Sequence, residues 1–275
     1  MIPIRDSNPT RRVPVLTLGL LAANVAIFLF WQPTLGGDDV EQQIFFFCNA
    51  EIPFEVSHQE NLAEGGAEAR RALDEDFLRP GQPPGAGEQI QAIVQQECPD
   101  KSWLASIFVA MFLHGSWLHI AGNMLFLWVF GNNVEDRLGY LVFPLFYVMG
   151  GIAAAGLQLA FDPSSTIPSL GASGAIGAVL GAYAVSFPHA RVTTLVVFFF
   201  ITVVEVPAVF VLGAWFVLQV FSGVGQLGID VGGGVAYWAH IGGFGFGAIV
   251  AWLFYRRPGP ARPEARGIPA RPDYF

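Results

Sequence analysis

Six apolar stretches, each close to the length of a membrane-spanning helix, most constrain how this chain can fold. A helix needs ~20 apolar residues to cross the hydrocarbon core of a bilayer. The stretches are residues 13–31, 117–131, 138–161, 170–187, 206–222 and 237–255. Of the 275 residues, 53% are hydrophobic and only 13% are charged, which is about half the charged share of a soluble domain. The sequence therefore predicts an all-α, polytopic membrane protein with a six-helix bundle.

The apolar stretch of residues 192–221 is too long for one span and must be divided. We place the division at Glu205-Val206-Pro207, because an acid followed by proline at the first helical position is typical of a helix start. The fifth span is then residues 206–222. Residues 192–204 are expected to form an interfacial or strand-like connection.

Arginines flank the first and last spans and predict the orientation of the bundle. Positively charged loops stay on the cytoplasmic side, and the arginines before and after the spans are Arg5, Arg11, Arg12, Arg256, Arg257, Arg262, Arg266 and Arg271. Both termini are therefore predicted to be cytoplasmic, which requires an even number of spans. The predicted parts are a cytoplasmic segment (1–12), a first helix retained in the membrane (13–31), an extracytoplasmic loop (32–102), a membrane core (103–255) and a cytoplasmic, disordered tail (256–275).

The loop of residues 32–102 is a long acidic insertion. It carries 14 acidic and 4 basic residues, a balance of −10, whereas the whole chain has a net charge of −8, so the remainder sums to +2. Nothing in this pattern indicates nucleic-acid binding. The only two cysteines, Cys48 and Cys98, lie in this insertion and either form a disulfide in an oxidising space or remain two free thiols. Residues 61–91 are compatible with a small lid or subdomain.

A serine and a histidine in two different spans indicate chemistry. Ionisable side chains inside a membrane are expensive and point to a functional site. In the predicted topology Ser173 lies three residues into the fourth span and His240 three into the sixth, while His119 and Asn123 lie in the first turns of the second. All four groups therefore reach a similar shallow depth below the outer surface.

Small residues beside Ser173 and His240 predict that their helices pack closely. Gly177 and Gly181 follow Ser173 at intervals of four, and Gly243 and Gly247 follow His240 at three and four, so each set shares one helix face. Small-residue stripes let membrane helices approach closely, as a hydrogen bond of ~2.6–3.2 Å between hydroxyl and imidazole demands.

This pairing is suited to nucleophilic catalysis. A serine hydroxyl needs a base to take its proton, and His240 is the candidate base. The negative charge that develops on a carbonyl oxygen needs preorganised donors, for which Asn123, His119 and the backbone N–H of Ser173 are available. No acid is placed to orient His240, so a Ser-His dyad is expected.

Four ordered motifs in residues 102–254 resemble the rhomboid intramembrane serine proteases. They are HGSWLHIAGN (114–123), Gly131-x-x-x-Glu135-x-x-x-Gly139, Gly171-Ala172-Ser173-Gly174 and AHIGG (239–243). The resemblance implies that Ser173 is the nucleophile, His240 the base, and His119 and Asn123 the oxyanion donors. His114, Gly171 and Gly174 match supporting positions.

The sequence departs from the family pattern at two places. The family often has a Trp-Arg pair before the first motif, where this chain has Ala105-Ser106. Many members carry an aromatic residue one turn after the serine, which stacks on the catalytic histidine; here that position is Gly177.

The resemblance implies a serine endopeptidase that cuts membrane-spanning protein substrates near the outer membrane face, without cofactor or metal. A multi-pass plasma-membrane protein of a prokaryote is expected, with transmembrane proteins and the lipid bilayer as partners and no nucleic acid; the oligomeric state stays open. One alternative is a catalytically silent rhomboid-like module that binds membrane proteins. Another is a transporter or channel, although the polar groups stop in the outer third of the membrane.

Overall fold

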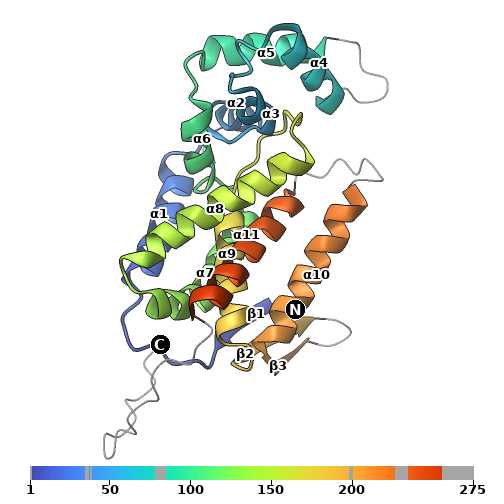
Figure 1. The fold of residues 1–275 in the computed structure, drawn as a ribbon. Helices are drawn as coiled ribbons and strands as arrows, with labels where there is room; N and C mark the ends of the chain where they lie inside the picture. The colour runs from blue at the N-terminus through green and yellow to red at the C-terminus, as the bar shows by residue number, and fades with distance from the viewer. Residues whose placement is uncertain are drawn as a thin grey trace, which may run out of the picture.

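The computed structural model describes residues 2–34, 37, 39–77, 85–197, 201–226 and 235–255. Within these residues the chain is mostly helical, with helices α1 to α11 and three strands. Figure 1 shows three levels: the helices of the insertion at one end, the apolar helices in the middle, and a small sheet at the opposite end near the N-terminus. The predicted disordered tail of residues 256–275 lies outside the described residues.

The insertion folds into a helical unit with its own apolar core. Its helices are α2 (Asp39–Asn49), α3 (Pro53–His58), α4 (Gly66–Phe77) and α5 (Ala86–Glu97). Their amphipathic faces bury a common cluster that includes Phe47, Ile52, Phe54, Leu62, Leu73 and Val94. Helix α4 and the first half of α5 lie in residues 61–91, where a small lid or subdomain was expected; residues 78–84 of that range are not described.

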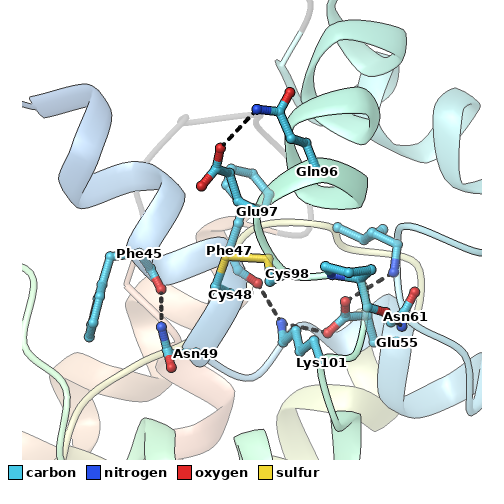
Figure 2. Close-up of a disulfide and its surroundings, with 12 residues drawn as sticks. Phe45, Phe47, Cys48, Asn49, Glu55, Asn61, Gln96, Glu97, Cys98 and Lys101 are labelled. Carbon is cyan, nitrogen blue, oxygen red and sulfur yellow. Dashed lines mark hydrogen bonds and ion pairs between the residues drawn. A yellow bond between two sulfur atoms is a disulfide. The ribbon is translucent and has the colours of Figure 1, made fainter.

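A disulfide closes the insertion. Cys48 in the last turn of α2 is bonded to Cys98, which directly follows α5 (Figure 2). Of the two alternatives that the sequence left open, the structure has the bridge. It ties together two segments separated by 50 residues and so holds both ends of the insertion at one place.

A buried ion pair lies beside the disulfide (Figure 2). Lys101, the only lysine of the chain, places its Nζ 2.6 Å from Oε2 of Glu55 and donates a hydrogen bond of 2.7 Å to the carbonyl of Phe47. Burial lowers the pKa of Lys101 and raises the pKa of Glu55, and in each case the partner's charge counteracts the shift. Buried charges are tolerated when they are paired in this way, so Lys101 anchors the insertion where it joins the membrane part.

Six helices of the described chain overlap the regions predicted to cross the membrane. They are α1 (Val15–Phe30), α7 (Trp117–Leu138), α8 (Val142–Phe161), α9 (Ser173–Ser186), α10 (Ala208–Gln226) and α11 (Tyr237–Val250), which continues into the short π-helix η1 (Ala251–Tyr255). Among the described residues, three helices are long and apolar enough to cross a bilayer, within α8, within α10 and along α11 with η1; α1 and α9 are shorter apolar helices. Helix α6 (Trp103–Ala110) was not predicted.

Helix α9 is the buried centre of the bundle and packs against α11 through glycines. A methyl group added at Gly177 would lie 3.0 Å from the carbonyl oxygen of His240. One added at Gly181 would meet the backbone of Phe244, and one at Gly247 the backbone of Ala178, at distances that no side chain tolerates. The predicted close approach of these two helices is therefore confirmed, and it is a backbone-to-backbone contact.

The three strands modify the prediction of an all-α protein. Strand β2 (Arg191–Val197) pairs antiparallel with β3 (Ile201–Pro207) on one side and with β1 (Ile2–Asp6) on the other. The sequence predicted a strand-like connection at residues 192–204 but not the N-terminal partner strand. The carboxylate of Asp6 holds β1 to the bundle, because it accepts hydrogen bonds of 2.7 Å from Tyr183 and from Asn133.

The glutamate of the second family-like motif is structural. Glu135 on α7 accepts hydrogen bonds from the backbone N–H groups of Leu16 and Thr17, at 3.0 and 2.7 Å, and from the hydroxyl of Thr17 at 2.6 Å. The first N–H groups of a helix have no acceptor inside the helix. Glu135 supplies one and fixes the start of α1 against α7.

Candidate active site

The structure brings Ser173 and His240 together. Ser173 is the first residue of α9, His240 lies in the first turn of α11, and the Ser173 Oγ is 2.7 Å from the His240 Nε2. The two residues are 67 positions apart in the chain. This contact depends on the glycine packing of the two helices, since bulkier residues would separate them.

A glutamine on α10 contacts the other imidazole nitrogen. Oε1 of Gln219 lies 2.9 Å from Nδ1 of His240. An amide oxygen only accepts hydrogen bonds, so this contact places the proton on Nδ1 and leaves Nε2 free to accept the hydroxyl proton of Ser173. Gln219 is a hydrogen-bond partner of His240 that the sequence analysis missed.

Aromatic rings from α10 and α11 flank the imidazole. The ring centroid of Trp215 lies 5.8 Å from that of His240 and is tilted by 37°, and Tyr237 meets the imidazole edge-on at 6.5 Å. The family's aromatic partner is replaced by Gly177 in this chain. In this chain Trp215 of α10 packs its aromatic ring against His240 instead.

His119 lies beside the loop that leads into Ser173. The backbone N–H of Gly115 donates a hydrogen bond of 3.3 Å to Nδ1 of His119, which places the proton of a neutral imidazole on Nε2. That Nε2 faces Gly171: a methyl group added there would lie 2.8 Å from it and 3.4 Å from the Ser173 Oγ. Gly171 also has φ +130, which favours glycine.

Asn123 and His114 lie in the same region of the fold. Asn123, one turn after His119 on α7, is 8% exposed, and its Nδ2 has no hydrogen-bond partner within the described parts of the chain. His114 is fully buried, with ring centroids 5.1 Å from His119 and 6.5 Å from Phe28. Its backbone is held by Gln32, which accepts from the His114 N–H at 3.0 Å and donates to its carbonyl at 2.9 Å.

Gly174 contributes to packing. A methyl group added at Gly174 would meet Cβ of Ala154 on α8 at 2.6 Å. Gly171 and Gly174 therefore serve different purposes, one leaving room for His119 and the other allowing α8 and α9 to touch.

The match to a family model decides the family. A model of the rhomboid domain matches residues 101–257, which is more than half of the chain. The chain belongs to the rhomboid family. It is 32% identical over 152 residues to Rhomboid protein 1, mitochondrial, of Saccharomyces cerevisiae, in an alignment that covers 54% of this chain and 41% of the yeast protein.

Other rhomboid relatives are plant and fish proteins. Rhomboid-like protein 11, chloroplastic, of Arabidopsis thaliana is 29% identical over 157 residues, covering 54% of this chain and 52% of that protein. Presenilin-associated rhomboid-like protein A, mitochondrial, of Danio rerio is 34% identical over 85 residues, covering 30% of this chain and 22% of that protein. The chain thus aligns with about half or less of the length of these rhomboid relatives.

These relatives contradict the prediction of a prokaryotic plasma membrane. Their names place them in mitochondria or chloroplasts of eukaryotes, which points away from that membrane. The cytoplasmic termini and the extracytoplasmic loop were part of the same localisation, although they were inferred from the arginines, and they are withdrawn with it. The reason is physical: flanking arginines orient a helix across a membrane but do not identify which membrane it is.

Proposed function

We propose that this rhomboid-family chain is an intramembrane serine endopeptidase that hydrolyses peptide bonds of membrane-spanning proteins. The observation that carries the proposal is the 2.7 Å contact between the Ser173 Oγ and the His240 Nε2. A nucleophile and a base within hydrogen-bond reach, with the base oriented by a third group, is the geometric signature of nucleophilic catalysis. Gln219 is that third group.

In the proposed reaction, His240 Nε2 takes the hydroxyl proton of Ser173 while the Ser173 Oγ attacks the substrate carbonyl. The Oγ–C bond forms a tetrahedral intermediate, which collapses when the protonated imidazole gives its proton to the leaving amine. Water then hydrolyses the acyl-enzyme by the same proton transfers in reverse order. Gln219 stays a hydrogen-bond acceptor throughout and keeps the proton of the neutral imidazole on Nδ1.

Three donors are available for the oxyanion. The Nδ2 of Asn123 is buried without a partner within the described chain, and a buried donor left without a partner costs about 1–3 kcal/mol. A developing negative charge would satisfy it. His119 contributes its Nε2–H, and Ser173 its backbone N–H at the start of α9, where the first N–H groups of a helix favour negative charge.

The proposed topology has six membrane-crossing helices, namely α1, α7, α8, α9, α10 and α11. Ser173 opens α9 directly after a loop that is hydrogen-bonded to the insertion, so water and substrate reach the nucleophile from the insertion side. The names of the mitochondrial and chloroplast relatives suggest an organellar membrane. The substrates are transmembrane proteins, whose peptide bonds enter the site near the insertion side of the membrane.

Purified protein in lipid vesicles with a fluorescent transmembrane reporter tests the function. We expect cleavage by the unchanged protein and its loss in both Ser173→Ala and His240→Ala, together with loss of fluorophosphonate labelling in Ser173→Ala. Matched controls are Ser186→Ala, at the far end of the same helix, and His189→Ala, in the loop that follows it. Both should cleave normally.

The outcomes separate the two functional classes. Full activity in Ser173→Ala would show that the nucleophile is assigned wrongly. Binding of transmembrane reporters without cleavage and without probe labelling would favour the catalytically silent module instead.

A further inference from the structure

An apolar cavity lies between the first two turns of α1, the end of α6 and the first two turns of α8. Its volume is about 240 Å³. Its ten lining residues are Gly19, Pro144 and Tyr147, with leucine, valine, methionine and phenylalanine at the other positions. None of these side chains is charged, so the cavity suits a hydrocarbon.

The cavity has a closed floor and an exposed rim. Met111, Phe143 and Tyr147 line it from below and are only 6%, 0% and 1% exposed. Gly19 of α1 and Pro144 of α8 line it at the surface and are exposed. The cavity is therefore a groove that a molecule can enter from outside the bundle, between α1 and α8.

Water does not suit this groove. A water molecule inside a protein needs two to four polar partners, whereas the one polar side-chain atom of the lining, the hydroxyl oxygen of Tyr147, is itself buried. An engineered apolar cavity of about 150 Å³ stays dry and takes up benzene. Helix α8 is apolar and long enough to cross a bilayer, so the hydrocarbon that surrounds the groove is that of lipid acyl chains.

An arginine lies at one end of the groove. The Nη1 of Arg12 is 3.1 Å from the place that a methyl group on Gly139 would take. The N–H of Phe143, on the cavity floor, donates a hydrogen bond of 3.0 Å to the carbonyl of Gly139, so the guanidinium lies about one helical turn, ~5.4 Å, from that floor.

This arginine is available to an anion. Arg12 is exposed, and its Cζ lies 5.7 Å from the ring centroid of Tyr140. In the part of the chain that the structure describes, no carboxylate lies within ion-pair distance of Arg12. A positive charge therefore stands beside an apolar groove, and this combination matches a molecule with a negative headgroup and a hydrocarbon tail.

We propose that this groove binds an acyl chain of an anionic phospholipid whose phosphate pairs with Arg12. Lipid tails are as apolar as the groove, so an acyl chain gains little by burial alone. The preference for this lipid comes from packing in the groove and from the arginine, which corresponds to about fivefold in affinity. This inference rests on the proposed membrane topology and not on the protease activity.

Native mass spectrometry of the purified protein tests the groove. From micelles with equal amounts of phosphatidylglycerol and phosphatidylcholine that carry the same acyl chains, we expect one retained phospholipid, with phosphatidylglycerol preferred about fivefold. Gly19→Leu should lower this retention at least tenfold, because a Cβ at Gly19 has no atom within 4 Å and the new side chain can fill the groove. Gly156→Leu, an exposed glycine of α8 that also has open space around its Cβ and does not line the groove, should retain the lipid normally.

A second pair of variants tests the headgroup contact. In Arg12→Gln the ratio of phosphatidylglycerol to phosphatidylcholine should fall to about one, while one phospholipid is still retained. Arg191→Gln, which removes an exposed arginine of β2, should keep the ratio of the unchanged protein. Thermal unfolding in detergent shows that each variant is folded.

Three results would overturn the proposal. Normal retention by Gly19→Leu means that the lipid binds elsewhere, and equal binding of the two lipids by the unchanged protein means that the headgroup is not recognised. A transmembrane reporter that displaces phosphatidylglycerol from Ser173→Ala, and that binds poorly once Gly19→Leu is added, would assign the groove to a substrate helix. None of these measurements requires cleavage, so failure of the proposed protease activity would leave them unchanged.

Discussion

Removing the hydrogen-bond acceptor that Gln219 offers to His240 should lower kcat without weakening substrate binding. In Gln219→Leu the Nδ1–H of His240 loses the contact that now measures 2.9 Å, in a part-buried position between α10 and α11. An unsatisfied buried donor costs about 1–3 kcal/mol. At about 1.4 kcal/mol per factor of ten, this cost corresponds to a fall in kcat of about fivefold to about a hundredfold. Without the acceptor, the imidazole also reaches the tautomer with its proton on Nε2, which does not accept the Ser173 proton.

The assay is steady-state cleavage of a transmembrane reporter in vesicles, with kcat and KM measured separately. We expect KM to stay within about twofold, since Gln219 acts through His240. Gln219→Glu keeps an acceptor oxygen near Nδ1 and should retain more of the kcat than Gln219→Leu. Phe221→Leu, two residues further along α10 with a side chain that is 73% exposed, is the matched control.

Two results would refute this reasoning. An unchanged kcat in Gln219→Leu means that the amide does not orient the imidazole. A loss of kcat in Phe221→Leu equal to that in Gln219→Leu means that any change on α10 disturbs the site, so that no specific role belongs to the hydrogen bond.

Three further predictions concern the surroundings of the site. Gly171→Ala should abolish cleavage while the protein stays folded by thermal unfolding, because the new methyl group would lie 2.8 Å from Nε2 of His119 at a φ of +130. Cys48→Ser should destabilise the insertion by up to ~4 kcal/mol, the chain-entropy value for the loop of 50 residues that the bond to Cys98 closes, and limited proteolysis should then cut the insertion first. The pKa of Glu51 is raised from 4.5 to about 7. Between these two pH values the folded state holds a proton that the unfolded state releases. The free energy of unfolding therefore falls as pH rises from about 4.5 to about 7, and the loss is complete above pH 7. Chemical unfolding at pH 8 should find Glu51→Gln more stable than the unchanged protein by up to about 3 kcal/mol, with the gain vanishing near pH 4; an equal gain at both values would contradict the assignment.

The contact between Ser173 and His240 was predictable because several local patterns agree. Each residue lies three positions into an apolar stretch, and glycines at intervals of three and four mark the faces on which the helices meet. Two side chains at the same depth, on helix faces that pack against each other, have few arrangements other than contact. The start of α10 was predicted to within two residues: the sequence placed a helix start at residue 206, whereas Pro207 ends β3 and the helix begins at Ala208.

Gln219 and Trp215 could not be predicted in the same way. Both lie inside α10, where the sequence shows no motif, and only the rotation of that helix about its axis decides which side chains face His240. The N-terminal strand was missed for a related reason. Residues 2–6 pair with residues 192–195, which are 186 to 193 positions further along the chain. Five residues are also too few for a pattern of period two to stand out.

Glu51 was one of 14 acids in a stretch that, by composition, predicts only a solvated surface. Composition does not distinguish the acid that folding buries from those that remain in water. The hydrogen bond from Ser169 to the Glu51 carbonyl makes that distinction, and it exists only after α2 to α5 have assembled.

The bridge between Glu51 of the insertion and Ser169 connects the insertion directly to the loop that leads into Ser173. A lipid-embedded helix bundle tolerates few substitutions, because α9 and α11 meet backbone to backbone. The insertion is held by its own core and its own disulfide, so its surface and loops can change without disturbing that bundle. Substitutions on the surface of the insertion would therefore change the surroundings of the loop before Ser173 without altering the contact between α9 and α11.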